Sequence, residues 1–217
     1  MYFLYHNGKK IYYSRSYTSK IEVVESYRLI LQEQDEKSPH CYVSGGQFDV
    51  DDGSIVVDAG VAEGNFSVDN INKCRKLILV ECDKRWNEAL RITFHREIAD
   101  GKVTIINKKL GAVSNNDTIT LDELYDLFGS IDFVKMDIEG AEQDAIRGGR
   151  KLIKESKNLK MAVCTYHTPN VFQETKHLLI DDFLLHVTYG YMVLNPMFGW
   201  KPPYFRRGMI RAEKVTS

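Results

Sequence analysis

The stretch IVVDAGVAEGNFS at residues 55–67 decides the fold. It begins with three β-branched residues and reaches Asp58 within one more position, and Gly60 and Gly64 follow. A short β-branched run of this kind is typical of a strand that is buried on both faces of a sheet. Glycine permits the sharp turn that leads from such a strand into a helix. The stretch therefore predicts a strand, a glycine turn and a helix in succession.

The same alternation of an apolar run and a helix-like segment recurs along the chain, with apolar runs at residues 77–80, 103–106, 131–136 and 161–165. Strands that alternate with helices form a parallel sheet with helices on both of its faces. Two later runs, at 187–194 and 208–212, predict an antiparallel hairpin that joins this sheet. We therefore expect an α/β fold with a Rossmann-like mixed sheet in three αβα layers.

The first fifty residues differ in character from the rest. Two aromatic, β-prone runs flank Asn7-Gly8, a dipeptide that favours a tight hairpin turn. Ser19 is a suitable N-cap for a helix over residues 20–34, with one apolar face formed by Ile21, Val24, Tyr27 and Leu31. We expect residues 1–50 to form an arm of a hairpin and a helix, and residues 51–217 to form the main domain.

Composition excludes several classes of protein. Of the 217 residues 43% are hydrophobic, which is too many for a disordered chain. The net charge is −1 and the cations form no cluster, so we expect no nucleic-acid partner. No apolar run approaches the roughly 18 residues that span a bilayer, and the N-terminus lacks the pattern of a signal peptide. We expect a cytoplasmic protein with no membrane partner; whether it forms a homo-oligomer stays open.

The four cysteines, Cys41, Cys74, Cys82 and Cys164, contain no CxxC pair and have no histidine at zinc-ligand spacing. We expect them to be reduced thiols. Asp137, Glu139 and His167 are candidate hard ligands of one divalent metal, but they also lack a recognisable ligand spacing. The sequence therefore predicts no bound metal, and whether a divalent metal assists the reaction stays open.

Carboxylates end three of the five central runs, namely Asp58, Glu81 and Asp137. Ligands bind at the carboxyl ends of parallel strands, and a carboxylate at the end of the second strand can accept both hydroxyls of a ribose. The pattern therefore predicts an adenosine-containing cofactor. A dinucleotide fingerprint requires glycines where this chain has Ala62 and Asn65, and the nearby acids repel a pyrophosphate. A sulfonium cation with an amino-acid tail suits these acids better, which favours S-adenosylmethionine, with S-adenosylhomocysteine as its product.

At this point the chain resembles a known family, the FkbM-type methyltransferases of the class I enzymes that use S-adenosylmethionine. The resemblance covers about residues 38–212 and rests on VVDAGVAEGNFS (56–67), LVECDKRWNEAL (79–90), TITLDEL (118–124), IDFVKMDIEGAE (131–142) and CTYH (164–167). It implies a seven-stranded mixed sheet and mostly O-methylation, often of a saccharide or a secondary metabolite. The expected partner is therefore a small-molecule or glycan acceptor.

The resemblance implies a set of site residues. Those expected to bind the cofactor are Asp58, Gly60, Glu63, Gly64, Asn65, Phe66, Glu81, Cys82, Asp83, Trp86, Asn107 and Asp137. Those expected to act in catalysis are His167 as general base, Asp137 as second base or as the group that orients the base, and Glu139 in the same cleft. A purely structural role stays open for four of them. Trp86 is then a core residue, Asn107 caps a loop, Glu139 is an acid in the first turn of a helix, and His167 is a loop histidine whose hydrogen bonds are made within the protein.

Two other functions stay open at this level. A nicotinamide-dependent oxidoreductase uses a similar fold, and a non-catalytic module binds an adenosyl ligand without turnover. Calorimetry with S-adenosylmethionine, S-adenosylhomocysteine and NAD distinguishes the oxidoreductase from a methyltransferase. Turnover with a suitable acceptor distinguishes the non-catalytic module from the enzyme.

Overall fold

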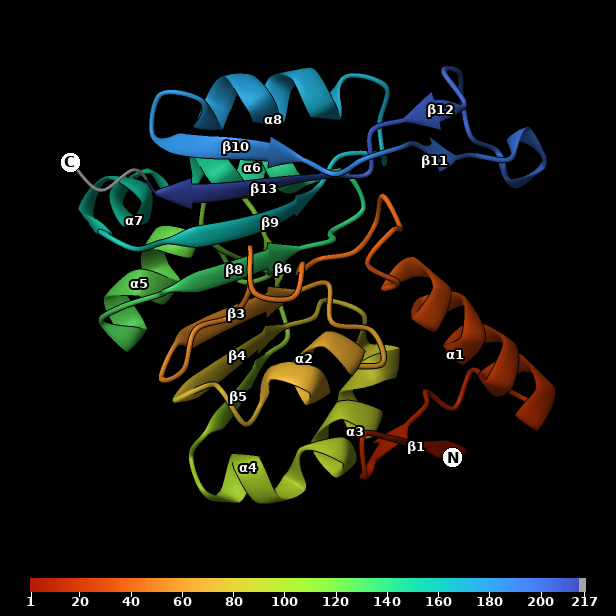
Figure 1. The fold of residues 1–217 in the computed structure, drawn as a ribbon. Coiled ribbons are helices and arrows are strands. Elements are labelled where there is room, and N and C mark those ends of the chain that lie inside the picture. The colour runs from red at the N-terminus through yellow and green to blue at the C-terminus, as the bar shows by residue number, and fades with distance from the viewer. Residues whose placement is uncertain (215–217) are drawn as a thin grey trace.

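The computed structural model describes residues 1–214, and a single seven-stranded sheet forms its centre (Figure 1). The strand order is β10-β13-β9-β8-β3-β4-β5. The strands are β3 (Ile55–Ala59), β4 (Lys76–Val80), β5 (Val103–Ile106), β8 (Phe133–Met136), β9 (Lys160–Cys164), β10 (Phe183–Val187) and β13 (Met209–Lys214). Strand β13 runs antiparallel to both of its neighbours, whereas β3, β4, β5, β8 and β9 pair in parallel. The expected seven-stranded mixed α/β sheet is confirmed.

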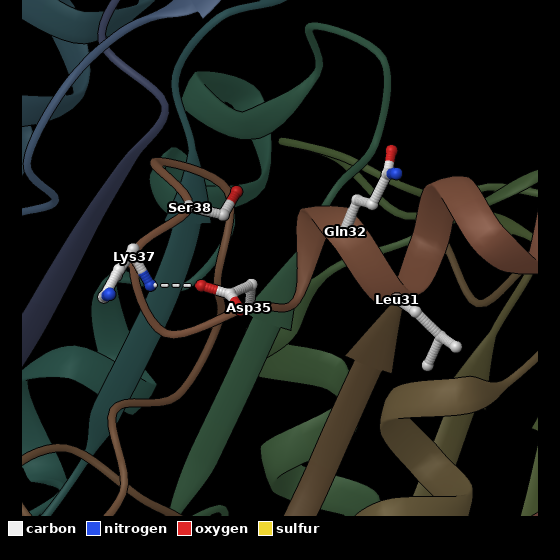
Figure 2. Close-up of a pocket in the computed structure, with 5 residues that line it drawn as sticks. All are labelled: Leu31, Gln32, Asp35, Lys37 and Ser38. Atoms are coloured by element: carbon white, nitrogen blue, oxygen red, sulfur yellow. Dashed lines mark hydrogen bonds between the residues drawn. The ribbon is translucent and has the colours of Figure 1, made fainter.

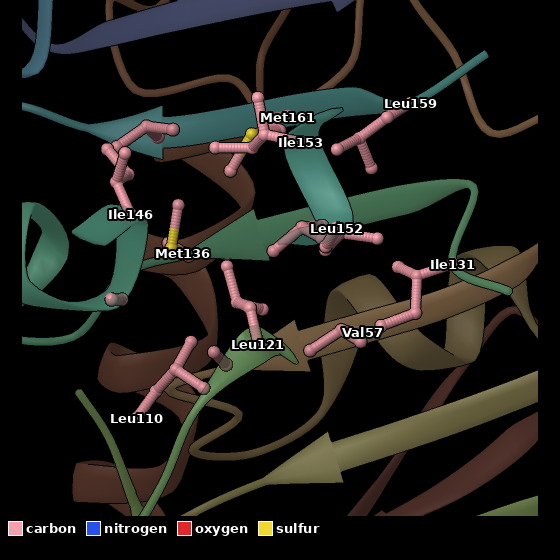
Figure 3. Close-up of a cluster of buried hydrophobic side chains, with 14 of the residues drawn as sticks. Val57, Leu110, Leu121, Ile131, Met136, Ile146, Leu152, Ile153, Leu159 and Met161 are labelled. Carbon is pink, nitrogen blue, oxygen red and sulfur yellow. The ribbon is translucent and has the colours of Figure 1, made fainter. Parts of the chain in front are cut away.

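Strand β3 shows why the short apolar runs become central strands. Ile55, Val57 and Ala59 pack into the apolar cluster on one face of the sheet, and Val56 packs into the cluster on the other face. Side chains alternate between the two faces of a strand, so a central strand must be apolar at nearly every position. Figure 3 shows Val57 in the first cluster, together with Leu121 and Leu152 from the covering helices.

Two groups of helices cover the two faces of the sheet. Helices α5 (Leu121–Phe128), α6 (Glu142–Arg147), α7 (Arg150–Glu155) and α8 (Val171–Leu179) contribute to the cluster that contains Val57. Helices α2 (Asn65–Asn70), α3 (Lys84–Thr93) and α4 (His95–Ala99) lie beside the other cluster. The expected αβα layers follow from this arrangement. The remaining short elements are β6 (Lys109–Leu110), β7 (Thr118–Ile119), β11 (Met192–Val193), η1 (Pro196–Phe198) and β12 (Phe205–Arg206).

The N-terminal arm contains the predicted hairpin, β1 (Phe3–His6) and β2 (Lys9–Tyr12), and the predicted helix, α1 (Lys20–Glu33). Asn7 and Gly8 both have positive φ, as the turn requires. The Ser19 side chain accepts a hydrogen bond from the backbone N–H of Glu22, which is the predicted N-cap. The predicted apolar face of α1 is not a buried face, because Ile21 is 70% exposed and Val23 is the residue that packs inward.

The arm shares its core with the rest of the chain. Ile11, Tyr13 and Val23 belong to the same apolar cluster as Leu90 and Phe94 of the α3–α4 region. The backbone N–H of Tyr12 also donates to Oγ1 of Thr93 at 3.0 Å. The arm is therefore packed onto the sheet-and-helix body, and the division of the chain at residue 50 stays a prediction.

One predicted strand is misplaced. The run at 187–194 is not a strand of the sheet; β10 ends at Val187, and the two-residue β11 begins only at Met192. Gly190 lies between them with a φ of +88°, which continues neither strand. The aromatic, β-prone composition of the run hid this turn. The antiparallel pairing itself is present one element earlier, between β10 and β13.

Within residues 1–214, every helix is too short or too polar to cross a bilayer.

Candidate functional site

A pocket of about 710 Å³ opens at the carboxyl ends of the parallel strands. Its wall includes the turn after β3, the ends of β4 and β8, and the segment after β9. Strand ends are where the free backbone groups and turn residues of a parallel sheet converge. Eight of the predicted site residues line the pocket: Gly60, Glu81, Cys82, Asp83, Trp86, Asp137, Glu139 and His167.

Glu81 is fixed at the end of β4. One carboxylate oxygen, Oε2, accepts from the backbone N–H of Ala62 at 3.0 Å, and Oε1 accepts from that of Asp83 at 2.7 Å. The residue is only 6% exposed, yet it lies on the pocket wall. Because each carboxylate oxygen accepts more than one hydrogen bond, Glu81 retains acceptor capacity toward a ligand. The β3 turn thus holds Glu81 in place for binding.

Asp137 is the centre of a cluster of four donors. Tyr42 donates its hydroxyl to Oδ2 at 2.7 Å, and Tyr166 donates to Oδ1 at 3.4 Å. His167 Nε2 lies 3.1 Å from Oδ1, and His40 Nε2 lies 3.3 Å from Oδ2. Burial alone raises the pKa of Asp137, but the two histidines and the charge of Lys135 outweigh it and hold that pKa well below its usual range. Asp137 is therefore ionised.

His167 lies between two carboxylates. Its Nδ1 is 2.9 Å from Oε1 of Glu142, and its Nε2 contacts Asp137. Burial by itself lowers the pKa of His167, but the hydrogen bonds to Asp137 and Glu142 raise it to about 9. The ring is therefore protonated at neutral pH and donates from both nitrogens. Its expected role as general base stays a prediction, and in this state the ring must release a proton before it can accept one.

Asp58, predicted to bind the cofactor directly, is held inside the fold. Its Oδ1 lies 3.1 Å from Nζ of Lys135, and its Oδ2 accepts from the Ser67 hydroxyl at 2.6 Å. Both partners of the ion pair are almost fully buried. Lys135 also donates to the backbone carbonyl of Gly60. Asp58 is thus placed to support the glycine turn through Lys135 and Ser67.

The other predicted cofactor residues are not among those that line the pocket. Gly64 lies against the ring of Phe94, and Phe66 stacks on Phe133. Asn107 donates its side-chain amide to the backbone carbonyl of Glu81 at 3.2 Å, which makes it a support for that residue. The polar atoms of Asn65 are buried, and within residues 1–214 they have no hydrogen-bond partner. Such groups cost free energy unless a ligand or water pairs with them, so Asn65 stays a candidate for ligand binding.

Backbone strain marks the same pocket. Ala62 and Glu139 both line it, and they have φ values of +47° and +60°. Non-glycine residues rarely adopt this region, and where they do they gather at functional sites. The positive φ of Glu139 shows that its position is not that of an ordinary first-turn helix residue, because α6 begins only at Glu142.

Glu63 lies beneath α1 and is 9% exposed. Its carboxylate accepts from the Ser26 hydroxyl at 3.0 Å, and burial raises its pKa above 4.5. Because the folded state disfavours the ionised form, Glu63 lowers stability as the pH rises from about 4.5 through the folded pKa. We expect Glu63→Gln to raise the free energy of unfolding at pH 7, with the gain vanishing below about pH 4.5.

Urea unfolding of Glu63→Gln and the wild type between pH 4 and pH 8 measures this difference. Glu155→Gln, at an exposed position on α7, is the matched control and should show no such dependence. If the gain in the free energy of unfolding did not change with pH, ionisation of the buried Glu63 would not be its cause.

Sequence reasoning missed two residues of the Asp137 cluster that come from the arm. His40 and Tyr42 lie in the segment between α1 and β3, nearly one hundred positions before Asp137. Their local context, Pro39 followed by polar and aromatic residues, is that of an ordinary turn. Glu142 is not among the predicted site residues, but it is fully buried against His167. No local signal distinguishes it, although a fully buried acid has to be paired.

A second hollow of about 570 Å³ lies at the end of α1 (Figure 2). It is lined by Leu31, Gln32, Asp35, Lys37 and Ser38, and the backbone N–H of Lys37 donates to Asp35 within it. All five residues come from one short stretch of chain, and the strand-end carboxylates are not among them. The hollow is a surface feature of the arm and not the strand-end site.

Comparisons with known proteins agree with this geometry. The family model described as "Methyltransferase FkbM domain" matches residues 60–191, which is more than half of the chain. No curated protein sequence matches the chain.

Solved structures show a related fold. Methyltransferase FkbM from Methylobacillus flagellatus KT has a TM-score of 0.63 and 18% identity, over 88% of this chain and 59% of that chain. A putative rRNA-methylase from Clostridium thermocellum has a TM-score of 0.51 and 12% identity, over 93% and 99%. Precorrin-6y C5,15-methyltransferase from Geobacter metallireducens GS-15 has a TM-score of 0.50 and 14% identity, over 77% and 82%. The chain thus spans about three fifths of the first of these proteins.

Proposed function

Because the chain belongs to the FkbM methyltransferase family, we propose that it transfers a methyl group from S-adenosylmethionine to a hydroxyl of a small-molecule or glycan acceptor. The observation that supports this most is the set of carboxylates on one pocket wall, namely Glu81, Asp83, Asp137 and Glu139. The wall also carries Arg85, Lys108 and Lys109, and Arg85 is paired with Asp83. The proposal therefore rests on where the individual acids lie, with Glu81 at the end of β4 and Asp137 and Glu139 after β8, and not on the net charge of the wall.

Glu81 holds the ribose. Its two oxygens are already oriented by backbone N–H groups, so little ordering is needed before they accept the two hydroxyls. Cys82, Asp83 and Trp86 continue from it along the same wall and form the adenine end. Trp86 also contacts the rings of Tyr13 and Tyr17, which fixes its orientation. Trp86 thereby serves both as packing for the arm and as a wall of the pocket.

When bound, S-adenosylmethionine supplies a methyl group that is already activated on a positively charged sulfur. Asp137 lies across the pocket from the β4 end and carries a fixed negative charge toward that position. The protein therefore mainly orients the two reactants, a contribution that reaches about 7–11 kcal/mol in ideal cases. The donors on Asp137 restrain its carboxylate, so that it does not swing away from the pocket.

The acceptor hydroxyl must lose a proton as it is methylated. Glu139 is an exposed carboxylate on the pocket wall, and among residues 1–214 its side chain makes no hydrogen bond or ion pair. Asp137 and His167 are engaged with each other. Glu139 is therefore placed to take the proton, and His167 holds Asp137 in position. A base in this position contributes typically about 10²–10⁴-fold to the rate.

Replacement of Glu81 tests the proposed cofactor site. We expect Glu81→Ala to weaken binding of S-adenosylhomocysteine by more than about tenfold, because two charge-assisted hydrogen bonds to the ribose are lost. Isothermal titration calorimetry measures the affinity, and Glu155→Ala on the exposed end of α7 is the control for loss of a carboxylate. Unchanged affinity would remove Glu81 from the site. Micromolar binding of NAD without binding of S-adenosylhomocysteine would reject the proposed function itself.

A further inference from the structure

We propose that His40, Asp137 and Cys164 form a binding site for one Zn²⁺ ion behind the wall of the strand-end pocket. The three side chains come from the segment before β3, the end of β8 and the end of β9. Each offers one ligand atom, and these atoms all lie within 4.8 Å of one another. An imidazole, a carboxylate and a thiolate are the three kinds of side chain that protein zinc sites use.

The separations of His40 from Asp137 and Cys164 are compatible with zinc coordination, and the one to Asp137 is long for a hydrogen bond. His40 Nε2 lies 3.3 Å from Oδ2 of Asp137 and 3.4 Å from Sγ of Cys164. A charge-assisted N–H···O bond is normally about 2.7–2.9 Å long. Two ligand atoms on one tetrahedral zinc ion, at about 2.0–2.3 Å from the metal, are separated by about 3.3–3.6 Å. The two separations from His40 therefore fit ligand atoms on one ion, and the third pair of atoms lies within 4.8 Å.

The two histidines of the Asp137 cluster differ in this respect. His167 makes contacts of 2.9 and 3.1 Å with its two carboxylates, so its hydrogen bonds satisfy it. His40 is 2% exposed, and within residues 1–214 its Nδ1 has no hydrogen-bond partner. A buried imidazole without a good partner costs free energy. Metal ligation through Nε2 places the proton of His40 on Nδ1, whereas both ring nitrogens of His167 already have carboxylate partners.

A carboxylate lies next to the second ring nitrogen of His40, an arrangement that is found for many metal-bound histidines. Nδ1 of His40 lies 3.5 Å from Oε2 of Glu33, on the side away from Asp137 and Cys164. The second nitrogen of a metal-ligating imidazole donates to a carboxylate, a backbone carbonyl or water, which fixes the tautomer and makes the ligand more basic. Glu33 is placed to do this for His40.

The fold fixes the segment that carries His40. The carbonyl oxygen of Pro39 accepts from the Thr188 hydroxyl at 2.7 Å, and a Cβ at Gly208 would lie 2.0 Å from that oxygen. Only glycine at 208 allows this approach. Arg211 further donates to the carbonyl of Cys41 at 2.6 Å. These contacts to the backbone on both sides of His40 hold the histidine at the ends of β8 and β9.

Charges in the cluster also allow a cation. Asp58 and Lys135 neutralise each other, while His167 is shared between the carboxylates of Asp137 and Glu142. Asp137 and Glu142 are therefore two carboxylates that share one cation, His167. Binding of Zn²⁺ releases the thiol proton of Cys164 to solvent as the Zn–S bond forms, so the cluster gains one net positive charge. The zinc site shares Asp137 with the proposed methyl-transfer site: Oδ2 faces His40, and Oδ1 contacts His167. Metal binding itself needs no methyl transfer.

Metal content and cobalt spectroscopy of the full chain test the proposal. We expect protein produced with zinc in the medium to retain about one zinc per chain after dialysis, as counted by plasma mass spectrometry. We expect Co²⁺ added to the metal-stripped chain to give a thiolate-to-cobalt charge-transfer band and the visible bands of tetrahedral cobalt. Neither readout requires an acceptor or turnover, and S-adenosylhomocysteine binding is measured separately, so failure of one proposal leaves the other testable.

Three variants test which side chains bind and support the zinc ion. Cys164→Ser should abolish the charge-transfer band and weaken zinc binding by more than about a hundredfold, since a ligand is lost. Glu33→Gln, at a side chain that is 45% exposed, should keep the band and weaken zinc binding by about 10–100-fold. Cys74→Ser removes a buried thiol elsewhere in the fold and should leave both unchanged.

Absence of retained zinc together with absence of the cobalt band in the wild type would overturn the proposal, and this outcome does not depend on whether a variant folds. A band that persists in Cys164→Ser would also overturn it, because the thiolate would then come from another cysteine.

Discussion

Lys135→Met is expected to lower the free energy of unfolding by about 3–5 kcal/mol, because it leaves the carboxylate of Asp58 buried without its partner. Nζ of Lys135 lies 3.1 Å from Oδ1 of Asp58, with side-chain exposures of 4% and 1%. Burial lowers the pKa of Lys135, but the charges of Asp58 and Asp137 outweigh it and raise that pKa, so the ammonium group stays charged. Urea unfolding of both proteins at neutral pH measures the loss.

Two comparisons separate the pair from a general effect of losing a lysine. Lys154→Met, at an exposed position on α7, should change stability by less than about 0.5 kcal/mol. The double variant Asp58→Asn/Lys135→Met removes both charges and should recover a large part of the loss. A small effect of Lys135→Met together with no recovery in the double variant would mean that Asp58 does not depend on this cation.

Gly60→Ala is the second large effect that we expect, with a loss of more than about 3 kcal/mol of stability and loss of S-adenosylhomocysteine binding. A Cβ at this position would lie 1.8 Å from the backbone carbonyl oxygen of Asp137, and the φ of +74° is itself unfavourable for alanine. The turn after β3 and the end of β8 must therefore separate. Because both line the pocket, their separation disrupts the cofactor site as well as the core.

Gly101→Ala isolates the contribution of backbone strain. Gly101 has a similar φ of +70°, but a Cβ there would meet no atom within 4 Å. We expect this variant to cost only about 1–2 kcal/mol, the strain of one left-handed residue, and to leave ligand binding intact. Thermal or urea unfolding of the two variants, with calorimetry of the ligand, provides the comparison. Equal losses at the two positions would show that contact with Asp137 is not what requires glycine at position 60.

Local sequence features predicted the elements of the sheet that carry the site. The runs at 77–80 and 103–106 lie within β4 and β5 as found. Strand β4 is central and must be apolar on both faces, whereas β5 is an edge strand whose β-branched run alone made it recognisable. The Asn7-Gly8 turn and the Ser19 cap were equally predictable, since each depends on backbone preferences within a few residues. The run at 187–194 failed because composition alone does not show where a strand turns.

The residues at the strand ends could also be predicted from the sequence. Glu81, Asp137 and Glu139 line the pocket because the parallel strands before them end at the same edge of the sheet. Asp58 follows the same rule but faces a buried lysine, and no local pattern shows whether a strand-end acid points toward a ligand or toward the core. The direction in which such an acid points depends on the cation that lies beside it on the neighbouring strand.

Periodicity and turn chemistry act over a few residues, and they therefore specified the succession of strands and helices, the glycine turn after β3 and the acids at the strand ends. The surroundings of Asp137 depend instead on how distant segments pack together. His40 and Tyr42 reach it from the arm, and Glu142 holds His167 from the start of α6. These contacts join segments far apart in the chain, and they exist because the packing of the arm onto the sheet, with Gly208 against Pro39, brings those segments together.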